Sequence, residues 1–111
     1  MKKLFIVTAA IFLSVFMANA DPAKKVNLSY QNGKLKIEAI HRVKDVKTHY
    51  IDKIVVNVDG KDVKTLALKS QSSNDAETLE LAIPEIKKGS KIQVITRCNE
   101  FGSKTGKLTV E

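Results

Sequence analysis

Apolar and polar residues alternate along most of the chain beyond residue 25, which is the pattern of β-strands with one buried face. The alternation predicts short strands that begin near Val26, Leu35, Tyr50, Val63, Leu79, Lys91 and Leu108. Asn32-Gly33 and Asp59-Gly60 predict two-residue hairpin turns, because both residue types tolerate positive φ. The polar or glycine-containing segments 42–48, 69–76, 87–89 and 99–106 predict the remaining connections.

These strands define the fold class. Short antiparallel strands with turn signals at regular intervals are typical of an immunoglobulin-like sandwich, for which roughly 90 residues are enough. The disulfide and core tryptophan of antibody domains are missing, because the chain has one cysteine and no tryptophan. We therefore predict an all-β, immunoglobulin-like antiparallel β-sandwich of about seven strands.

Residues 1–20 have the features of a secretory signal peptide. Two lysines follow the first residue, a mostly apolar run extends to Phe16, and residues 18–20 read Ala-Asn-Ala. The apolar run is too short to span a bilayer comfortably. We expect cleavage after Ala20, which leaves residues 21–111 as one sandwich domain, periplasmic or secreted, without stable membrane insertion.

The basic charge of the chain comes from lysine. The net charge of +7 falls to +5 when Lys2 and Lys3 leave with the signal. Lysines that alternate with apolar residues solvate the outer face of a strand and protect sheet edges. Nucleic-acid binding favours arginine and stacking aromatics, but the only arginines are Arg42 and Arg97. We therefore expect no nucleic-acid partner.

Both histidines and the cysteine are predicted to meet at one end of the sandwich. If each strand reverses the direction of the last, the tight turns lie at one end and the longer loops at the other. His41 ends a strand that enters the long-loop end, His49 begins the strand that leaves it, and Cys98 ends another that enters it. His41 and Cys98 also have the parity of the core-facing residues in their strands.

This set of side chains suits a transition metal. Two imidazoles and one thiolate can bind iron, copper or zinc, and Arg97 beside Cys98 would favour the thiolate. A blue-copper site is disfavoured, because no methionine remains beyond residue 20 to be the axial ligand. The competing hypothesis is that Cys98 is a small buried apolar residue and that each histidine lies at the surface.

Two short motifs resemble those of the desulfoferrodoxin and superoxide reductase family. His-Tyr-Ile at 49–51 follows His41, and Cys-Asn-Glu-Phe-Gly stands at 98–102, where the family has His-Pro…His-Tyr-Ile and Cys-Asn-x-His-Gly. The resemblance extends over residues 40–102. It implies an immunoglobulin-like domain that binds non-haem iron with four histidines and a cysteine and reduces superoxide at an open sixth position. The positions that match family ligands are His41, His49 and Cys98.

Several features of that family are missing. Phe101 occupies the position of the C-terminal histidine, and Arg42 replaces the proline. The histidine and the glutamate–lysine pair expected near the N-terminus have no counterpart. Two histidines cannot supply four ligands, so Glu100, Asp45 or water would have to fill the remaining positions. The resemblance implies an oxidoreductase with a redox role in oxidant defence, whereas the incomplete ligand set leaves catalytic activity open.

A second resemblance gives an alternative without a metal. Residues 48–61, 87–90 and 99–102 are similar to the carrier-binding subunit of bacterial thiosulfate oxidation, which lacks a counterpart of Cys98. It implies a non-catalytic periplasmic sandwich that binds a protein partner through its long loops. The expected partner is thus a periplasmic redox or carrier protein.

Overall fold

Seven antiparallel strands build the part of the chain that the computed structural model describes, residues 21–111. The expected signal peptide, residues 1–20, lies outside the described residues. The strands are β1 (Lys25–Gln31), β2 (Lys34–Ile40), β3 (Ile51–Val58), β4 (Lys61–Ala67), β5 (Ala76–Ala82), β6 (Lys91–Cys98) and β7 (Ser103–Thr109). The described range holds no helix of the length and apolarity needed to cross a membrane.

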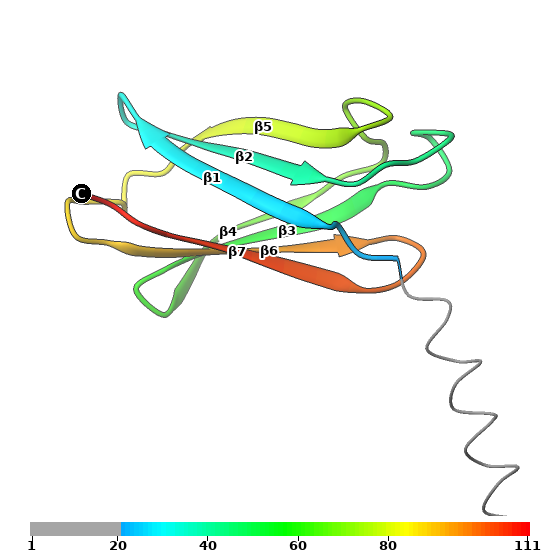
Figure 1. Ribbon diagram of the computed structural model, residues 1–111. Coiled ribbons are helices and arrows are strands. Elements are labelled where there is room, and N and C mark those ends of the chain that lie inside the picture. Colours follow the sequence, from blue (N-terminus) through cyan, green and yellow to red (C-terminus); the bar gives the residue numbers. More distant parts are fainter. Residues whose placement is uncertain (1–20) are drawn as a thin grey trace, which may run out of the picture.

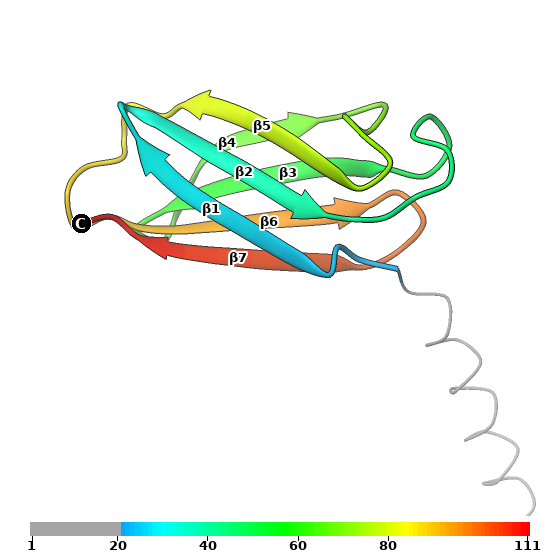
Figure 2. The same cartoon turned by 45° about the horizontal axis from the view of Figure 1, so that its top comes forward.

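The strands form two sheets that face one another (Figures 1 and 2). One sheet has three strands in the order β1-β2-β5, and the other has four in the order β4-β3-β6-β7. Every neighbouring pair is antiparallel. The prediction of an all-β antiparallel sandwich of about seven strands is confirmed.

The two ends of the sandwich differ, as the turn signals predicted. Asn32 and Gly33 have φ angles of 55° and 77°, and Asp59 and Gly60 have 53° and 89°, so both pairs form the tight left-handed turns that match strand twist. These turns lie at one end of the molecule, whereas the β2–β3, β4–β5 and β6–β7 loops lie at the other (Figure 1). The candidate ligands belong to this second end, which we call the loop end.

The core between the sheets follows the predicted alternation. One face of each central strand is buried, and its side chains are apolar, except for Thr96 of β6, until the strand reaches the loop end. The buried residues on these strands include Leu35, Ile37, Ala39, Ile54, Val56, Val58, Ile92 and Val94. The same parity continues to His41 and Cys98, which are 2% and 3% exposed. His41 and Cys98, whose side chains can bind a metal, therefore lie where the apolar core ends.

The prediction for the last strand is wrong in its starting point. Strand β7 begins at Ser103 rather than near Leu108, and the β6–β7 loop ends at Gly102 rather than at Gly106. Gly106 was interpreted as a turn residue, but it is a buried position within the strand. A Cβ on Gly106 would lie 2.6 Å from the carbonyl oxygen of Val26, so glycine is needed there for close contact with β1.

Candidate metal centre

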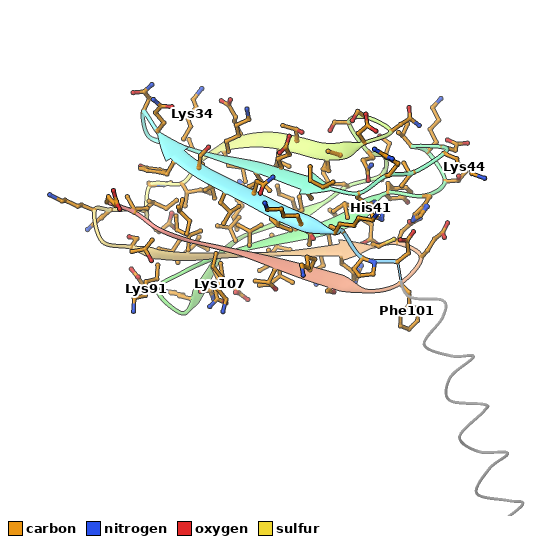
Figure 3. All side chains as sticks on the ribbon, viewed as in Figure 1. Lys34, His41, Lys44, Lys91, Phe101 and Lys107 are labelled. Carbon is orange, nitrogen blue, oxygen red and sulfur yellow. The ribbon has the colours of Figure 1, made fainter. Side chains whose placement is uncertain are left out.

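His41, His49 and Cys98 come together at the loop end. One ligand atom from each lies within 4.8 Å of the others, and the two imidazole rings meet edge to face with centroids 4.8 Å apart. Figure 3 shows His41 near this end, opposite the end at which Lys34 and Lys91 lie. The predicted convergence of the three side chains is confirmed, while their binding of a metal stays a prediction.

Each of the three residues is placed by the end of a strand. His41 follows the last residue of β2, and Cys98 is the last residue of β6. His49 was expected to begin a strand, but β3 begins two residues later at Ile51. The β3–β6 ladder is irregular between Ile51 and Lys53, opposite Cys98. Such bulges re-aim neighbouring side chains, and this one lies directly beside the candidate centre.

Asn99 fastens the segment around His49 to the strand that carries Cys98. Its side-chain oxygen accepts a hydrogen bond from the N–H of Tyr50 at 2.9 Å, and its amide nitrogen donates to the carbonyl of Thr48 at 3.0 Å. The N–H of Asn99 also donates to the carbonyl of Tyr50. His49 lies between the two residues that Asn99 holds, so this amide fixes the separation of His49 and Cys98.

Gln71, from the β4–β5 loop, holds His41. The glutamine is 4% exposed, and its Oε1 lies 2.8 Å from His41 Nδ1 and 3.2 Å from the N–H of Ile51. Its Nε2 donates to the carbonyls of His41 and Ser73 at 2.7 and 2.9 Å. Both polar atoms of the amide therefore have hydrogen-bond partners, as a buried glutamine requires.

This network determines which nitrogen of His41 carries hydrogen. Because both N–H groups of Gln71 point at carbonyl oxygens, its Oε1 must be the atom that faces the ring. An oxygen can only accept, so Nδ1 of His41 is the donor. In the neutral ring Nε2 then carries a lone pair, and this nitrogen lies 3.1 Å from the carbonyl oxygen of Asp21.

The sulfur of Cys98 receives a backbone hydrogen bond and has no arginine beside it. The N–H of Glu100 donates a hydrogen bond to Sγ at 3.4 Å. Arg97 was expected to support the thiolate, but successive residues of a strand face opposite sides. Its guanidinium instead makes two hydrogen bonds to Asp52, at 2.9 and 3.2 Å.

Two carboxylates flank His49, and a third lies elsewhere. Asp21 Oδ2 is 2.9 Å from His49 Nε2, and Glu100 Oε2 is 3.9 Å from Nδ1. The first contact is short but badly angled, so within residues 21–111 the buried Nε2 has no hydrogen-bond partner. Asp45 accepts a hydrogen bond from the N–H of Lys47 in an exposed turn. Of the acidic residues considered from the sequence, Glu100 is therefore near the centre, whereas Asp45 shapes a loop.

The sequence did not reveal the roles of Gln71 and Asp21. Gln71 lies in a stretch of serine, asparagine and aspartate that is typical of an exposed loop, and nothing in its composition signals a buried amide. Asp21 follows the predicted cleavage site directly, and no motif in the sequence marks it as a ligand. Phe101, at the position of a family histidine, is 63% exposed and adds no ligand.

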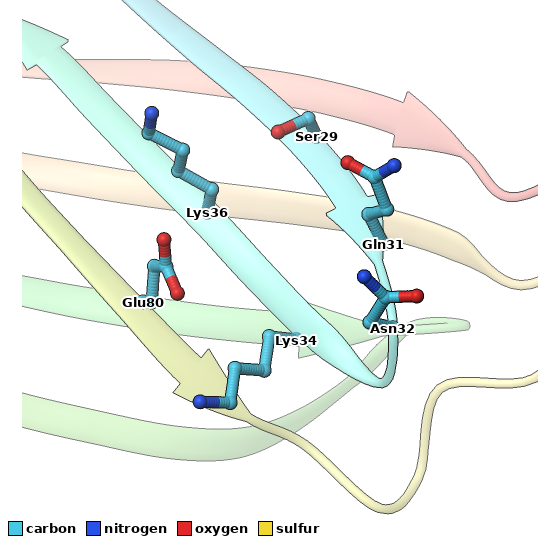
Figure 4. Close-up of a pocket in the computed structure, with 6 residues that line it drawn as sticks. All are labelled: Ser29, Gln31, Asn32, Lys34, Lys36 and Glu80. Carbon is cyan, nitrogen blue, oxygen red and sulfur yellow. The ribbon is translucent and has the colours of Figure 1, made fainter.

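The loop end also has a surface hollow next to Cys98. Its lining includes Asp52, Arg97, Cys98, Glu100 and Phe101. A different depression lies on the outer face of the three-stranded sheet, as Figure 4 shows. It is lined by Ser29, Gln31, Asn32, Lys34, Lys36 and Glu80, and these side chains include no cysteine or histidine. The chemistry capable of holding a transition metal is thus at the loop end.

Comparison with known proteins gives structural but not sequence matches. No family model matches the chain, and no curated protein matches its sequence. Two structures of superoxide reductase (neelaredoxin) from Ignicoccus hospitalis, each of a variant, align with TM-scores of 0.52 at 13% identity. The alignments cover 86% and 87% of this chain and 84% of each of those chains. A superoxide reductase in the oxidised state aligns with a TM-score of 0.47 at 15% identity, over 83% of this chain and 90% of that one. The fold of this chain is therefore that of the superoxide reductases, a desulfoferrodoxin-like fold.

Proposed function

We propose that this chain binds a non-haem iron ion through His41, His49 and Cys98 and serves a redox role in oxidant defence. The observation that carries the proposal is the meeting of these three side chains, with ligand atoms within 4.8 Å, at the loop end of a superoxide reductase-like fold. Two imidazoles and a thiolate are ligands that iron accepts.

The surroundings of the three side chains fit a metal ion. The ring of His41 presents the lone pair of Nε2, because Gln71 occupies Nδ1. The buried Nε2 of His49 has no hydrogen-bond partner among the described residues, and buried polar atoms rarely stay without one. The N–H of Glu100 points at the sulfur of Cys98 and stabilises negative charge there.

Iron held here would supply one-electron exchange with a small oxidant, with a thiolate ligand that raises its electron density. The protein's own contribution is to fix the ligands and limit access. His41 and Cys98 are almost completely buried, and the side chain of His49 is 17% exposed. Only a small molecule can reach these atoms, so the substrate class that we propose is a small oxidant such as superoxide.

Metal analysis tests this proposal. Protein purified without a histidine tag under reducing, iron-replete conditions should contain iron, and oxidation should produce an iron(III)–thiolate absorption band. Cys98→Ser should abolish the band, whereas the matched surface variant Ser103→Ala should keep it. Wild-type protein without metal under these conditions would refute the proposal.

We also propose that the protein works in the periplasm or outside the cell. The support is the signal-like sequence of residues 1–20, which ends just before the sandwich begins. Cell fractionation and the intact mass of the purified protein test this. A chain that begins at Asp21 and is recovered from the periplasm or the medium is expected. A full-length chain confined to the cytoplasm would contradict export.

A second candidate function is the capture of a periplasmic redox or carrier protein without any metal. Phe101 favours it, because within the described part of the chain it is the large apolar side chain left exposed, and it lies on the β6–β7 loop. Under this alternative, His41→Ala and Cys98→Ser keep partner binding, and Phe101→Ala weakens it. Loss of partner binding when iron is removed would argue against this metal-free alternative.

A further inference from the structure

We propose that the carboxylate of Asp21 is a fourth protein ligand of the metal ion held by His41, His49 and Cys98. The inference rests on the metal site proposed above. It names a residue that would occupy one of the ligand positions for which this chain has no histidine. It follows from the way in which the oxygens of Asp21 meet both imidazole rings.

Asp21 places two oxygens against the two rings. Its carboxylate Oδ2 lies 2.9 Å from Nε2 of His49, and its carbonyl oxygen lies 3.1 Å from Nε2 of His41. The first contact has no hydrogen-bond geometry. The second is within hydrogen-bond distance. Each contact places an oxygen of Asp21 beside a ring nitrogen of a candidate ligand.

The buried Nε2 of His49 has no hydrogen-bond partner within residues 21–111, and a cation shared with the nearby carboxylate would supply one. Two nitrogen or oxygen donors, each about 2.0–2.2 Å from one metal ion, lie no more than about 4.4 Å from each other. The separations between the oxygens of Asp21 and the two ring nitrogens, 2.9 and 3.1 Å, are within this limit. A metal ion bound by both imidazoles would therefore have the oxygens of Asp21 within reach.

Backbone contacts hold Asp21 in this place from both sides of the centre. Its N–H donates to the carbonyl of Phe101 at 3.1 Å, in the loop that follows Cys98. Pro22 packs against Gly102 so closely that a Cβ on this glycine would lie 2.8 Å from the proline ring. Further on, the N–H of Lys24 donates to the carbonyl of Ile40, directly before His41. The carboxylate is therefore presented by an anchored segment.

Charge also favours a carboxylate ligand. Two neutral imidazoles and one thiolate around a divalent cation leave one positive charge in a largely buried site, and an unbalanced buried charge is costly. The Asp21 carboxylate offsets this charge at the metal, while in a chain that begins at Asp21 the cationic α-amino group of the same residue donates to the carbonyl of Phe101. A set of nitrogen, sulfur and oxygen donors suits a divalent ion such as Fe²⁺, Co²⁺ or Zn²⁺.

Co²⁺ titration of the protein, followed by absorbance in reducing buffer, tests the role of Asp21. The full chain is expressed with residues 1–20, and intact mass establishes that each purified variant begins at the same residue. Asp21→Asn keeps the shape but loses the charge, and should weaken Co²⁺ affinity at least about tenfold. Asp75→Asn is the matched control, because Asp75 lies at the same end and its carboxylate only approaches the exposed Arg42, at 3.7 Å. The control should bind as wild type does.

A ligand exchange separates direct binding from a purely electrostatic effect. Asp21→Cys offers a second thiolate, so the thiolate charge-transfer intensity per bound Co²⁺ should rise from that of one thiolate to that of two. Unchanged affinity in Asp21→Asn, or the intensity of one thiolate in Asp21→Cys, would overturn the assignment of Asp21 alone. Failure of the wild-type protein to bind Co²⁺ or Fe²⁺ would overturn the metal site as well.

Discussion

Gln71 and His41 are joined by hydrogen bonds that run in opposite directions. The ring donates from Nδ1 to the amide oxygen at 2.8 Å, and the amide nitrogen donates to the backbone carbonyl of the histidine at 2.7 Å. One side chain therefore fixes both the ring and the backbone of the same residue. A metal ligand held in this way has a defined tautomer and a defined orientation before any metal binds.

The tautomer of His41 is the first prediction. In metal-free protein, long-range ¹⁵N–¹H correlation spectra should show a hydrogen on Nδ1, the nitrogen that faces the amide oxygen of Gln71. Gln71→Leu should lower metal affinity by about 10- to 100-fold and the free energy of unfolding by about 1–3 kcal/mol, because it leaves buried polar groups unpaired. Gln93→Leu, the same change at an exposed position of β6, is the control. An Nδ1 without a hydrogen in the wild-type protein would contradict the assignment.

A second prediction concerns Asn99, whose side chain should contribute both to the stability of the fold and to metal affinity. Asn99→Ala loses both side-chain hydrogen bonds around His49 and should cost about 1–2 kcal/mol of stability. Metal affinity should also fall, because His49 is no longer held against Cys98. Asn57→Ala removes a comparable pair of hydrogen bonds at the opposite end, to Asp62 and from Gly60.

The comparison of these two asparagine variants gives a clear outcome. Both should unfold at lower denaturant concentration, but only Asn99→Ala should bind Co²⁺ more weakly in a titration. Equal metal affinity in Asn99→Ala and Asn57→Ala would show that the segment around His49 keeps its place without Asn99.

Much of the fold and the three side chains of the candidate centre could be predicted from sequence, for a physical reason. A strand with one buried face alternates in polarity, so the parity of Leu35 and Ile37 alone places His41 at the edge of the core. The roles of Gln71 and Asp21 could not be predicted in this way. They depend on hydrogen bonds between segments 30 and 20 residues apart, which local patterns do not encode.

The error at Gly106 has the same origin and supports a third prediction. Glycine has no side chain at this position because Val26 of the facing strand approaches it, and sequence alone does not distinguish this from a turn. Gly106→Ala should lower the free energy of unfolding by about 1–3 kcal/mol, since backbone or strand must shift. Thr105→Ala, at the exposed neighbouring position, should change it by less than about 0.5 kcal/mol. Urea unfolding of the two variants checks this, and equal stabilities would contradict it.

The last prediction concerns Glu77 on β5, a buried carboxyl group outside the candidate ligand set. Burial raises its pKa above the ordinary value of 4.5, and hydrogen bonds from Ser72 and from the backbone only partly oppose this. The folded protein therefore keeps a proton that the unfolded chain releases, and the free energy of unfolding falls as the pH rises from 4.5 through the raised pKa. Glu77→Gln keeps the acceptor oxygen and removes the charge, so its stability should fall less between pH 4 and pH 7 than that of the wild type. Urea unfolding at both pH values measures the difference, with the exposed Glu80→Gln on the same strand as the control. If the free energy of unfolding changes by the same amount between pH 4 and pH 7 in the wild type and in Glu77→Gln, the role assigned to Glu77 is contradicted.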